Sequence, residues 1–297
     1  MLAIVGTVPI RDFPLTHGPL SVSGPWLEIR GNRVDINRGT PALMAAAVAA
    51  SQALGKESPY GFLVGDIGHG RGSRELYHFL TEHAADHSFS VMTFHYLQPI
   101  AHWNEKVINA VLSVHRPPML IADAGFMYAA KMSGHAQRFD LFTPDMGELA
   151  FLADENAPHP FYTRGFILHE SNRAPELIAR AYAHGNAARY LLVKGAMDYV
   201  ADRSGILEAV SEPSVPVLEP IGGTGDTVTG IVSVLIEAGY AVPEAAAAAA
   251  MANRLAGRYA QPTPATQVMD IIKQISRALG EVLGLGVSKV THAPLPQ

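Results

Sequence analysis

Residues Gly222-Gly223-Thr224-Gly225-Asp226 lead directly into an almost wholly apolar segment, residues 227–238, which is predicted to be a buried helix. Glycines let the backbone approach a ligand closely and adopt positive φ angles. At a helix start the first amide groups lack partners within the helix, and the helix dipole adds positive potential there. The stretch therefore indicates an anion site that suits phosphate, although it matches neither the Walker P-loop nor the dinucleotide fingerprint.

Asp226 allows two interpretations. A carboxylate in the first turn of a helix is most often a cap that complements the dipole. Here the carboxylate also lies where the anion would bind. It could take a proton from an attacking hydroxyl while the loop amides hold the charge on a transferred phosphoryl group. The second interpretation makes Asp226 a candidate catalytic base.

Outside this stretch, short apolar runs alternate with longer Ala-rich stretches. The alternation is typical of a mainly parallel sheet covered by helices on both faces, which is a three-layer α/β/α fold. The runs are apolar on both sides, as buried parallel strands are. We expect strands at residues 61–65, 89–96, 119–123, 140–143 and 190–194, and helices at 41–54, 74–85, 104–114, 177–184, 227–238, 243–257 and 263–282.

Residues 199–219 break this alternation. Arg203-Ser204-Gly205 is a hairpin-like turn between two short runs, so we expect an antiparallel edge on the sheet. We expect Asp198 and Asp202, which flank one hairpin strand, to be surface charges. No linker is long enough to divide the chain, and residues 1–297 are predicted to form one domain with a loose end at 291–297.

The composition excludes several kinds of site. The 297 residues include no cysteine, which rules out disulfides, thiolate catalysis and Cys-bound metals. Lys and Arg number 22 against 27 Asp and Glu, a net charge of −5 that argues against a nucleic-acid partner. No run approaches the roughly 18–20 apolar residues of a membrane span. The first ten residues have no basic leader, so we expect them to belong to the fold of a cytoplasmic protein.

Three further segments follow predicted strands, where parallel sheets bind ligands. Lys194-Gly195 ends one strand, and the cation could meet phosphate oxygens there. In residues 143–148, Asp145 could simply cap a helix, and Glu148 could help to hold Mg²⁺ through water near nucleotide phosphates. Residues 65–72 form a glycine-rich turn that is either a plain loop or a wall of the substrate site.

Two other kinds of site have little support. His83 and His87 are four residues apart and could share a helix face, but no HExxH motif accompanies them. We therefore expect solvated histidines there rather than a metal site. No GxSxG elbow occurs, so the sequence gives no support for serine hydrolase chemistry.

Taken in order, five segments resemble those of the ribokinase-like superfamily, and most closely its NAD(P)H-hydrate dehydratase branch. That branch typically has a GPGLGR-like turn, a DADAL-like strand end, a TPHPGE segment, a VLKG strand and a GGTGD loop. The resemblance extends over roughly residues 35–257 and implies a ribokinase-like fold. The segments here are GDIGHGR at 65–71, DAGFM at 123–127, TPDMGE at 143–148, LVKGA at 192–196 and GGTGD at 222–226.

The resemblance implies a reaction in which ATP or ADP phosphorylates the ring hydroxyl of hydrated NAD(P)H, after which phosphate is lost and NAD(P)H restored. It implies Mg²⁺ at Glu148, and often a homo-oligomer. Asp226 would be the catalytic base and a substrate contact, with Gly70 and Asp145 also on the substrate side. The nucleotide and its phosphates would be contacted by Lys194, Gly195, Ala196, Met197, Asp198, Gly222, Gly223, Thr224 and Gly225.

The departures from the branch fall on the substrate side. Asp145 stands where the branch has the His of HPGE, and Met146 stands where it has Pro. Phosphoryl transfer is therefore inferred more firmly than the dehydratase substrate. Asp145-x-x-Glu148 is also similar to the Asn-x-x-Glu pattern of ribokinase-like kinases, which favours a sugar or vitamin-precursor kinase as the alternative. A third possibility is a non-catalytic adenine-nucleotide sensor.

Replacing Asp226 by Asn is expected to abolish either activity with little loss of stability, as for a surface loop.

Overall fold

The computed structural model describes residues 1–155 and 173–284, through which one eleven-stranded sheet runs in the order β11-β10-β9-β8-β7-β6-β1-β5-β2-β3-β4. The neighbours from β9 to β5 are all parallel. Because parallel strands end at the same edge of a sheet, the residues that follow them are brought together there. The strands are β1 (Leu2–Val8), β2 (Thr16–Ser23), β3 (Trp26–Ile29), β4 (Asn32–Asp35), β5 (Tyr60–Gly65), β6 (Val91–Phe94), β7 (Met119–Ala122), β8 (Leu141–Phe142), β9 (Tyr190–Val193), β10 (Asp198–Asp202) and β11 (Gly205–Val210).

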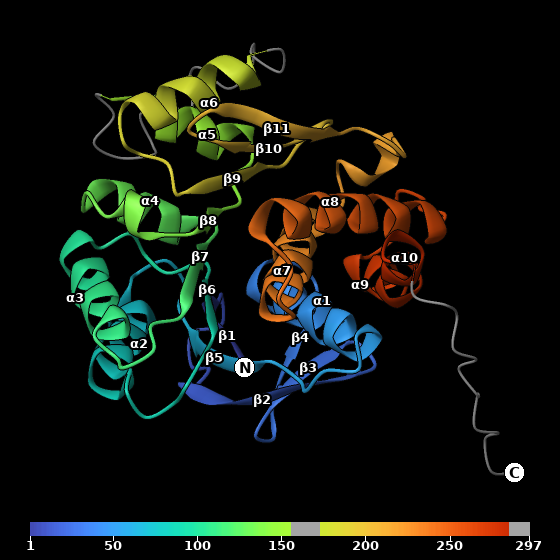
Figure 1. Cartoon of the computed structure of the whole chain (residues 1–297). Coiled ribbons are helices and arrows are strands. Elements are labelled where there is room, and N and C mark those ends of the chain that lie inside the picture. The colour runs from blue at the N-terminus through green and yellow to red at the C-terminus, as the bar shows by residue number, and fades with distance from the viewer. Residues whose placement is uncertain (156–172, 285–297) are drawn as a thin grey trace, which may run out of the picture.

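Helices cover both faces of the sheet, as Figure 1 shows, and two separate apolar clusters fill the spaces between the layers. The three-layer arrangement predicted from the alternation of strands and helices is thus present. On one side lie α1 (Gly39–Ala53), α7 (Thr224–Glu237), α8 (Val242–Tyr259), α9 (Val268–Ile272) and α10 (Ile275–Val282). On the other lie α2 (Arg71–His83), α3 (Ala101–Leu112), α4 (Gly125–Met132), α5 (Met146–Ala153) and α6 (Ala174–Ala183).

Both ends of the sheet are antiparallel, and only one of them was predicted. The expected hairpin edge is present as β10 and β11. At the other end, β2, β3 and β4 pair antiparallel beyond β5. These strands are half-exposed and include Pro, Gly and charged residues, so no continuous apolar run marks them in the sequence. By contrast β1, the first segment of the chain, is buried over its whole length.

The last predicted helix, residues 263–282, is in fact two shorter helices, α9 and α10, with a break at Lys273–Gln274. Apolar side chains are nevertheless buried on both sides of the break, namely Val268, Ile271, Ile272, Ile275 and Leu279. His83 and His87 do not share a helix face, because α2 ends at His83. The predicted loose end at 291–297 lies outside the described residues.

Helices α1 and α7 pack closely enough to bring their N-termini together. Gly230 makes this possible, because a Cβ atom there would lie 2.3 Å from the Leu43 carbonyl oxygen. One turn earlier on each helix, the Gly39 amide donates to the Asp226 carboxylate across 2.7 Å. The two helices therefore run in the same direction, and both start at the edge where the parallel strands end. Within the described part of the chain, no helix is long and apolar enough to cross a bilayer.

Candidate active site

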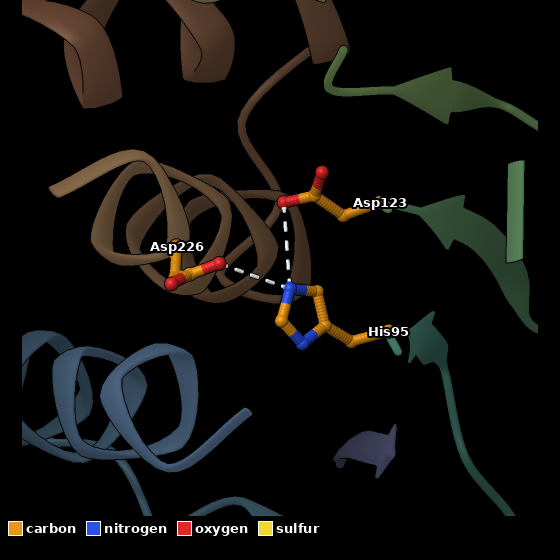
Figure 2. Close-up of side chains that lie close together, drawn as sticks. All are labelled: His95, Asp123 and Asp226. Carbon is orange, nitrogen blue, oxygen red and sulfur yellow. Dashed lines mark hydrogen bonds and ion pairs between the residues drawn. The ribbon is translucent and has the colours of Figure 1, made fainter. Parts of the chain in front are cut away.

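Polar side chains from several strands and helices meet where the parallel strands end. Figure 2 shows three of them: His95 follows β6, Asp123 follows β7, and Asp226 lies in the first turn of α7. His95 and Asp123 are almost completely buried, and the Asp226 side chain is 14% exposed. A ligand at this edge could thus reach Asp226 but not the imidazole behind it.

Asp226 accepts a hydrogen bond on each carboxylate oxygen. The Gly39 amide donates to Oδ2 at 2.7 Å, and His95 Nε2 lies 3.0 Å from Oδ1. Burial raises the pKa of Asp226, but His95, Lys194 and the Gly39 amide together outweigh burial and lower it to about 2. The carboxyl group is therefore ionised at neutral pH. The expectation that Asp226 belongs to a surface loop is wrong, since its side chain is mostly buried and each carboxylate oxygen accepts a hydrogen bond.

The buried carboxylate of Asp123 is paired with Lys194. The Lys194 ammonium donates to Asp123 Oδ1 at 2.9 Å and to Oδ2 at 2.8 Å, and the Thr229 hydroxyl donates to Oδ2 at 2.6 Å. Burial opposes the charge on Lys194, but the carboxylates of Asp123, Glu148 and Asp226 outweigh it and raise the pKa of the ammonium. Lys194 is therefore a fixed cation at the end of β9.

The glycine loop before α7 has the features of an anion site. Gly223 is the N-cap residue and has φ +97°, which favours glycine. The backbone amide groups of Thr224, Gly225 and Asp226 have no hydrogen-bond acceptor among residues 1–155 and 173–284. A Cβ atom at Gly225 would lie 3.7 Å from Lys194 Nζ, whose third N–H is not used by Asp123. Free amides, a helix N-terminus and a buried cation therefore converge at one point.

Arg38 lies on another side of the same loop. Its side chain is exposed, and a Cβ atom at Gly222 would meet the Arg38 stem at 3.6 to 3.9 Å. Arg38 is also the N-cap residue of α1, the helix that supplies the Gly39 amide to Asp226. The residues before α1 thus complete the site from the opposite end of the sequence.

The predicted nucleotide segment, Lys194 to Asp198, is fastened to α8. Arg254 donates to Asp198 Oδ2 at 2.7 Å and to the carbonyl oxygens of Gly195 and Ala196 at 3.0 and 2.9 Å. Asp198 also accepts the Gly195 amide at 3.0 Å. The prediction that Asp198 is a surface charge is wrong, since it is 5% exposed and paired. Met197, in contrast, is 40% exposed and free to meet a ligand.

Asp145 and Glu148 form a capping box at the start of α5. Asp145 Oδ1 accepts the Glu148 amide and Glu148 Oε2 accepts the Asp145 amide, both at 2.8 Å. Asp145 therefore caps α5, as the structural interpretation of this residue predicts. Burial, with the charges of Asp145 and Asp123 added, raises the pKa of Glu148 well above its ordinary value. A dication beside these crowded carboxylates would relieve that repulsion.

Gly70 belongs to a different network. Its amide and those of Gly68 and Ser73 donate to the Asp66 carboxylate, which closes the glycine-rich turn on itself. The turn borders a cavity of about 620 Å³ that Arg11 and Arg71 also line. Among the described residues, no hydrogen bond joins Asp66 or Gly70 to Asp226.

His95, Asp123 and Asp226 also place metal-ligand atoms within 4.8 Å of one another. Their oxygens already have hydrogen-bond partners, because Lys194 bonds both oxygens of Asp123, and the Gly39 amide and His95 each bond one oxygen of Asp226. This cluster therefore has no need of an ion, and the oxygen-rich pair Asp145 and Glu148 suits Mg²⁺ better.

Sequence reasoning missed His95, Arg38 and Arg254 as parts of the site. A signal for His95 was present, since it stands at the carboxyl end of a predicted parallel strand, where ligands bind. Arg38 and Arg254 carry no comparable signal, because only the packing of α1 and α8 brings them to the loops.

Comparison with known proteins gives a family and several relatives. The model of a carbohydrate-kinase family described as NAD(P)H-hydrate dehydratase matches residues 99–277. An uncharacterized protein of Methanocaldococcus jannaschii is 42% identical over 220 residues, which cover 74% of this chain and 90% of that protein. The bifunctional NAD(P)H-hydrate repair enzyme of Hyperthermus butylicus is 36% identical over 109 residues, 36% of this chain but 19% of that enzyme.

Solved structures share the fold at low identity. The ADP/ATP-dependent NAD(P)H-hydrate dehydratase of Bacillus subtilis, crystallised with ATP/Mg²⁺ and soaked with CoA, has a TM-score of 0.55 at 15% identity, over 95% of this chain and 90% of that one. A ribokinase-like protein of Enterococcus faecalis has a TM-score of 0.57 at 15% identity, over 95% and 87%. The expected ribokinase-like fold is confirmed. The family match begins after residues 65–71, so it lends no support to a substrate role for Gly70.

Proposed function

Because this chain belongs to the carbohydrate-kinase family of NAD(P)H-hydrate dehydratases, we propose that it phosphorylates the ring hydroxyl of hydrated NAD(P)H and then eliminates phosphate. Membership makes it a nucleotide-dependent enzyme of the carbohydrate-kinase-like superfamily. The observation that carries the proposal is the position of Asp226. It is an ionised carboxylate beside the mostly buried cation of Lys194 and three amide groups that have no acceptor among the described residues.

Asp226 is the proposed general base. Its two hydrogen bonds fix the carboxylate, and each oxygen keeps a second lone pair for a substrate hydroxyl. As the hydroxyl attacks the terminal phosphoryl group, its proton passes to Asp226. The bond from that phosphorus to its bridging oxygen breaks, and the nucleotide leaves with the electron pair and one phosphate fewer. A base with a pKa of about 2 is weak, but it remains ionised at any physiological pH and takes the proton only as the new O–P bond forms.

The phosphate side is proposed to consist of the loop amides, Lys194 and Arg38. The amides of Thr224, Gly225 and Asp226 face the charge that develops on the transferred group. Lys194 adds a cation that is already in place, so the site does not have to reorganise during the reaction. The backbone of residues 195–198, held by Arg254, would contact the nucleotide.

Asp145 and Glu148 fit a magnesium ion. In the capping box each carboxylate uses one oxygen, and the other oxygen has no partner among the described residues. Through these oxygens the two residues would hold the ion or its water ligands. Bound there, Mg²⁺ would neutralise charge on the nucleotide phosphates.

The elimination step has a simple chemical basis. Hydroxide is a poor leaving group and phosphate is a good one, so phosphorylation prepares the hydrate for loss of its oxygen. The C–O bond breaks with its electron pair going to the phosphate oxygen, and a proton is lost from the neighbouring carbon. The amides and Lys194 that held the phosphoryl group would then hold the departing dianion.

The direct test uses hydrated NADH with Mg²⁺ and either ADP or ATP. The absorbance of the reduced nicotinamide is expected to rise with wild-type protein and to stay flat with Asp226→Asn. Absence of turnover with both nucleotides, in protein that binds nucleotide by calorimetry, would contradict the dehydratase proposal and favour a nucleotide sensor.

A ribokinase-like small-molecule kinase is the second candidate. It is favoured by Asp145 and Glu148, whose spacing is similar to the Asn-x-x-Glu pattern of those kinases. A panel of sugars and vitamin-precursor alcohols, scored by ADP formation, distinguishes the two. Consumption of ATP with one alcohol, but not with hydrated NADH, would replace the first proposal by the second.

A further inference from the structure

We propose that His95 is a positioning residue for Asp226. Through Nε2 the histidine holds the Asp226 carboxylate in place and keeps it ionised. The inference rests on the proposed function, in which Asp226 is the base. His95 lies outside the five segments that resemble the family, and its side chain is inaccessible to solvent. It therefore acts on the reaction only through Asp226.

Among the described residues, each nitrogen of the imidazole has a single hydrogen-bond partner. Nε2 lies 3.0 Å from Asp226 Oδ1, and Nδ1 lies 2.9 Å from the hydroxyl of Thr40. A carboxylate only accepts hydrogen bonds, so Nε2 must be the donor, whereas a hydroxyl can serve Nδ1 as donor or acceptor. Thr40 follows Gly39, whose amide bonds the other oxygen of Asp226. One turn of α1 therefore holds Asp226 directly through its backbone and indirectly through the histidine.

The imidazole also separates two carboxylates. Its Nε2 lies 3.9 Å from Asp123 Oδ2 as well as 3.0 Å from Asp226 Oδ1, and Figure 2 shows the ring reaching toward both. Because Asp123 is already bonded by Lys194 and Thr229, the N–H of His95 Nε2 donates to Asp226 instead. Without that donor, Asp226 would face a like charge in a largely dry site.

Several charged or titratable groups face Asp226 and set its charge together. They are His95 and Tyr96 after β6, Asp123 after β7 and Lys194 after β9. Of these, His95 alone has a hydrogen bond to the carboxylate among the described residues. Loss of this bond would remove the largest influence that opposes burial and would raise the pKa of Asp226.

Two amide variants separate the two contacts of the ring. In His95→Gln the side-chain amide extends about as far as Nε2 and can still donate to Asp226. In His95→Asn it extends only about as far as Nδ1 and can still bond Thr40. Both variants keep a polar group in the buried position, so that comparable folding, checked by urea unfolding, is expected. His102→Asn, a change of the same kind on an exposed histidine of α3, is the control.

The measurement is the pH profile of kcat/KM, whose acid limb reports the free enzyme's base. For His95→Asn we expect about tenfold lower kcat at pH 7 and an acid limb at least about one pH unit higher, whereas His95→Gln recovers most of the loss. His102→Asn should match wild type. Equal losses at every pH in both variants, with an unmoved acid limb, would show a merely structural role and overturn the proposal.

A second readout does not depend on activity. In ¹³C-aspartate-labelled protein, the carboxyl signal missing from Asp226→Asn belongs to Asp226 and can be titrated. His95→Asn is expected to raise the midpoint of that titration, and an unchanged midpoint would overturn the proposal. If wild type turns over no substrate, the proposed function fails while this titration still decides the role of His95.

Discussion

Lys194, at the end of β9, donates to both carboxylate oxygens of Asp123, which lies two strands away at the end of β7. The pair spans β8 and lies directly behind Gly225, the middle of the predicted anion site. It thus ties the strand ends together and places a fixed positive charge where phosphate is proposed to bind.

Lys194→Met should therefore be costly to stability. It leaves the Asp123 carboxylate buried without its cation, a change worth about 3 kcal/mol or more. We expect urea unfolding at pH 7 to show a loss of that size, together with weaker nucleotide binding by calorimetry. The double variant Asp123→Asn/Lys194→Met should be more stable than Lys194→Met alone. A single variant as stable as wild type would contradict the pairing.

Two glycines of α7 provide a matched pair of variants. Gly225→Ala adds a methyl group 3.7 Å from Lys194, an ordinary contact, but fills the space proposed for phosphate. Stability should change by less than about 1 kcal/mol, while ATP affinity falls at least about tenfold. Gly230→Ala adds the same group 2.3 Å from the Leu43 carbonyl, which pushes α1 from α7 and should cost about 2 kcal/mol or more. The reverse ranking in thermal unfolding would contradict the close packing of α1 on α7.

Asp226→Asn should reduce both activity and stability. The folded-state pKa of about 2 lies below the ordinary 3.8, so ionised Asp226 stabilises the fold above about pH 4, and this contribution disappears as the pH falls through 2. The difference in pKa corresponds to about 2 kcal/mol. Urea unfolding at pH 7 should show a loss of that order for the variant, and the gap should narrow below pH 4. A gap that is constant from pH 7 to 2.5 would indicate that its charge adds nothing to stability.

Arg254→Met tests whether α8 orders the nucleotide segment. The change removes the donors that hold Asp198, Gly195 and Ala196. We expect the KM for ATP to rise about tenfold, with kcat changed much less, because the loss falls on binding rather than on the base. Arg258→Met, one turn further along α8 at an exposed position, is the control and should match wild type. Equal KM values for both variants would remove Arg254 from this role.

Much of this molecule could be predicted from local sequence. The apolar runs fix the parallel strands because a strand buried on both faces needs apolar residues at successive positions. The GGTGD stretch fixes the start of α7 and the position of Asp226, since glycine tolerates the positive φ of the N-cap. A single domain, a homo-oligomer and the roles of the individual site residues stay predictions.

Only the tertiary structure decided what surrounds Asp226. Its partners Gly39 and His95 are 187 and 131 residues away in the chain, and no periodicity or local motif reports contacts at such separations. The pairing of Asp198 with Arg254, 56 residues apart, was hidden for the same reason. Strands β2 to β4 were missed because they are half-exposed and no continuous apolar run marks them. Local sequence sets which backbone conformation forms. The surroundings of a carboxylate depend instead on which distant segments pack against it. Those segments decide whether it is solvated, caps a helix or is held between an imidazole and a helix start.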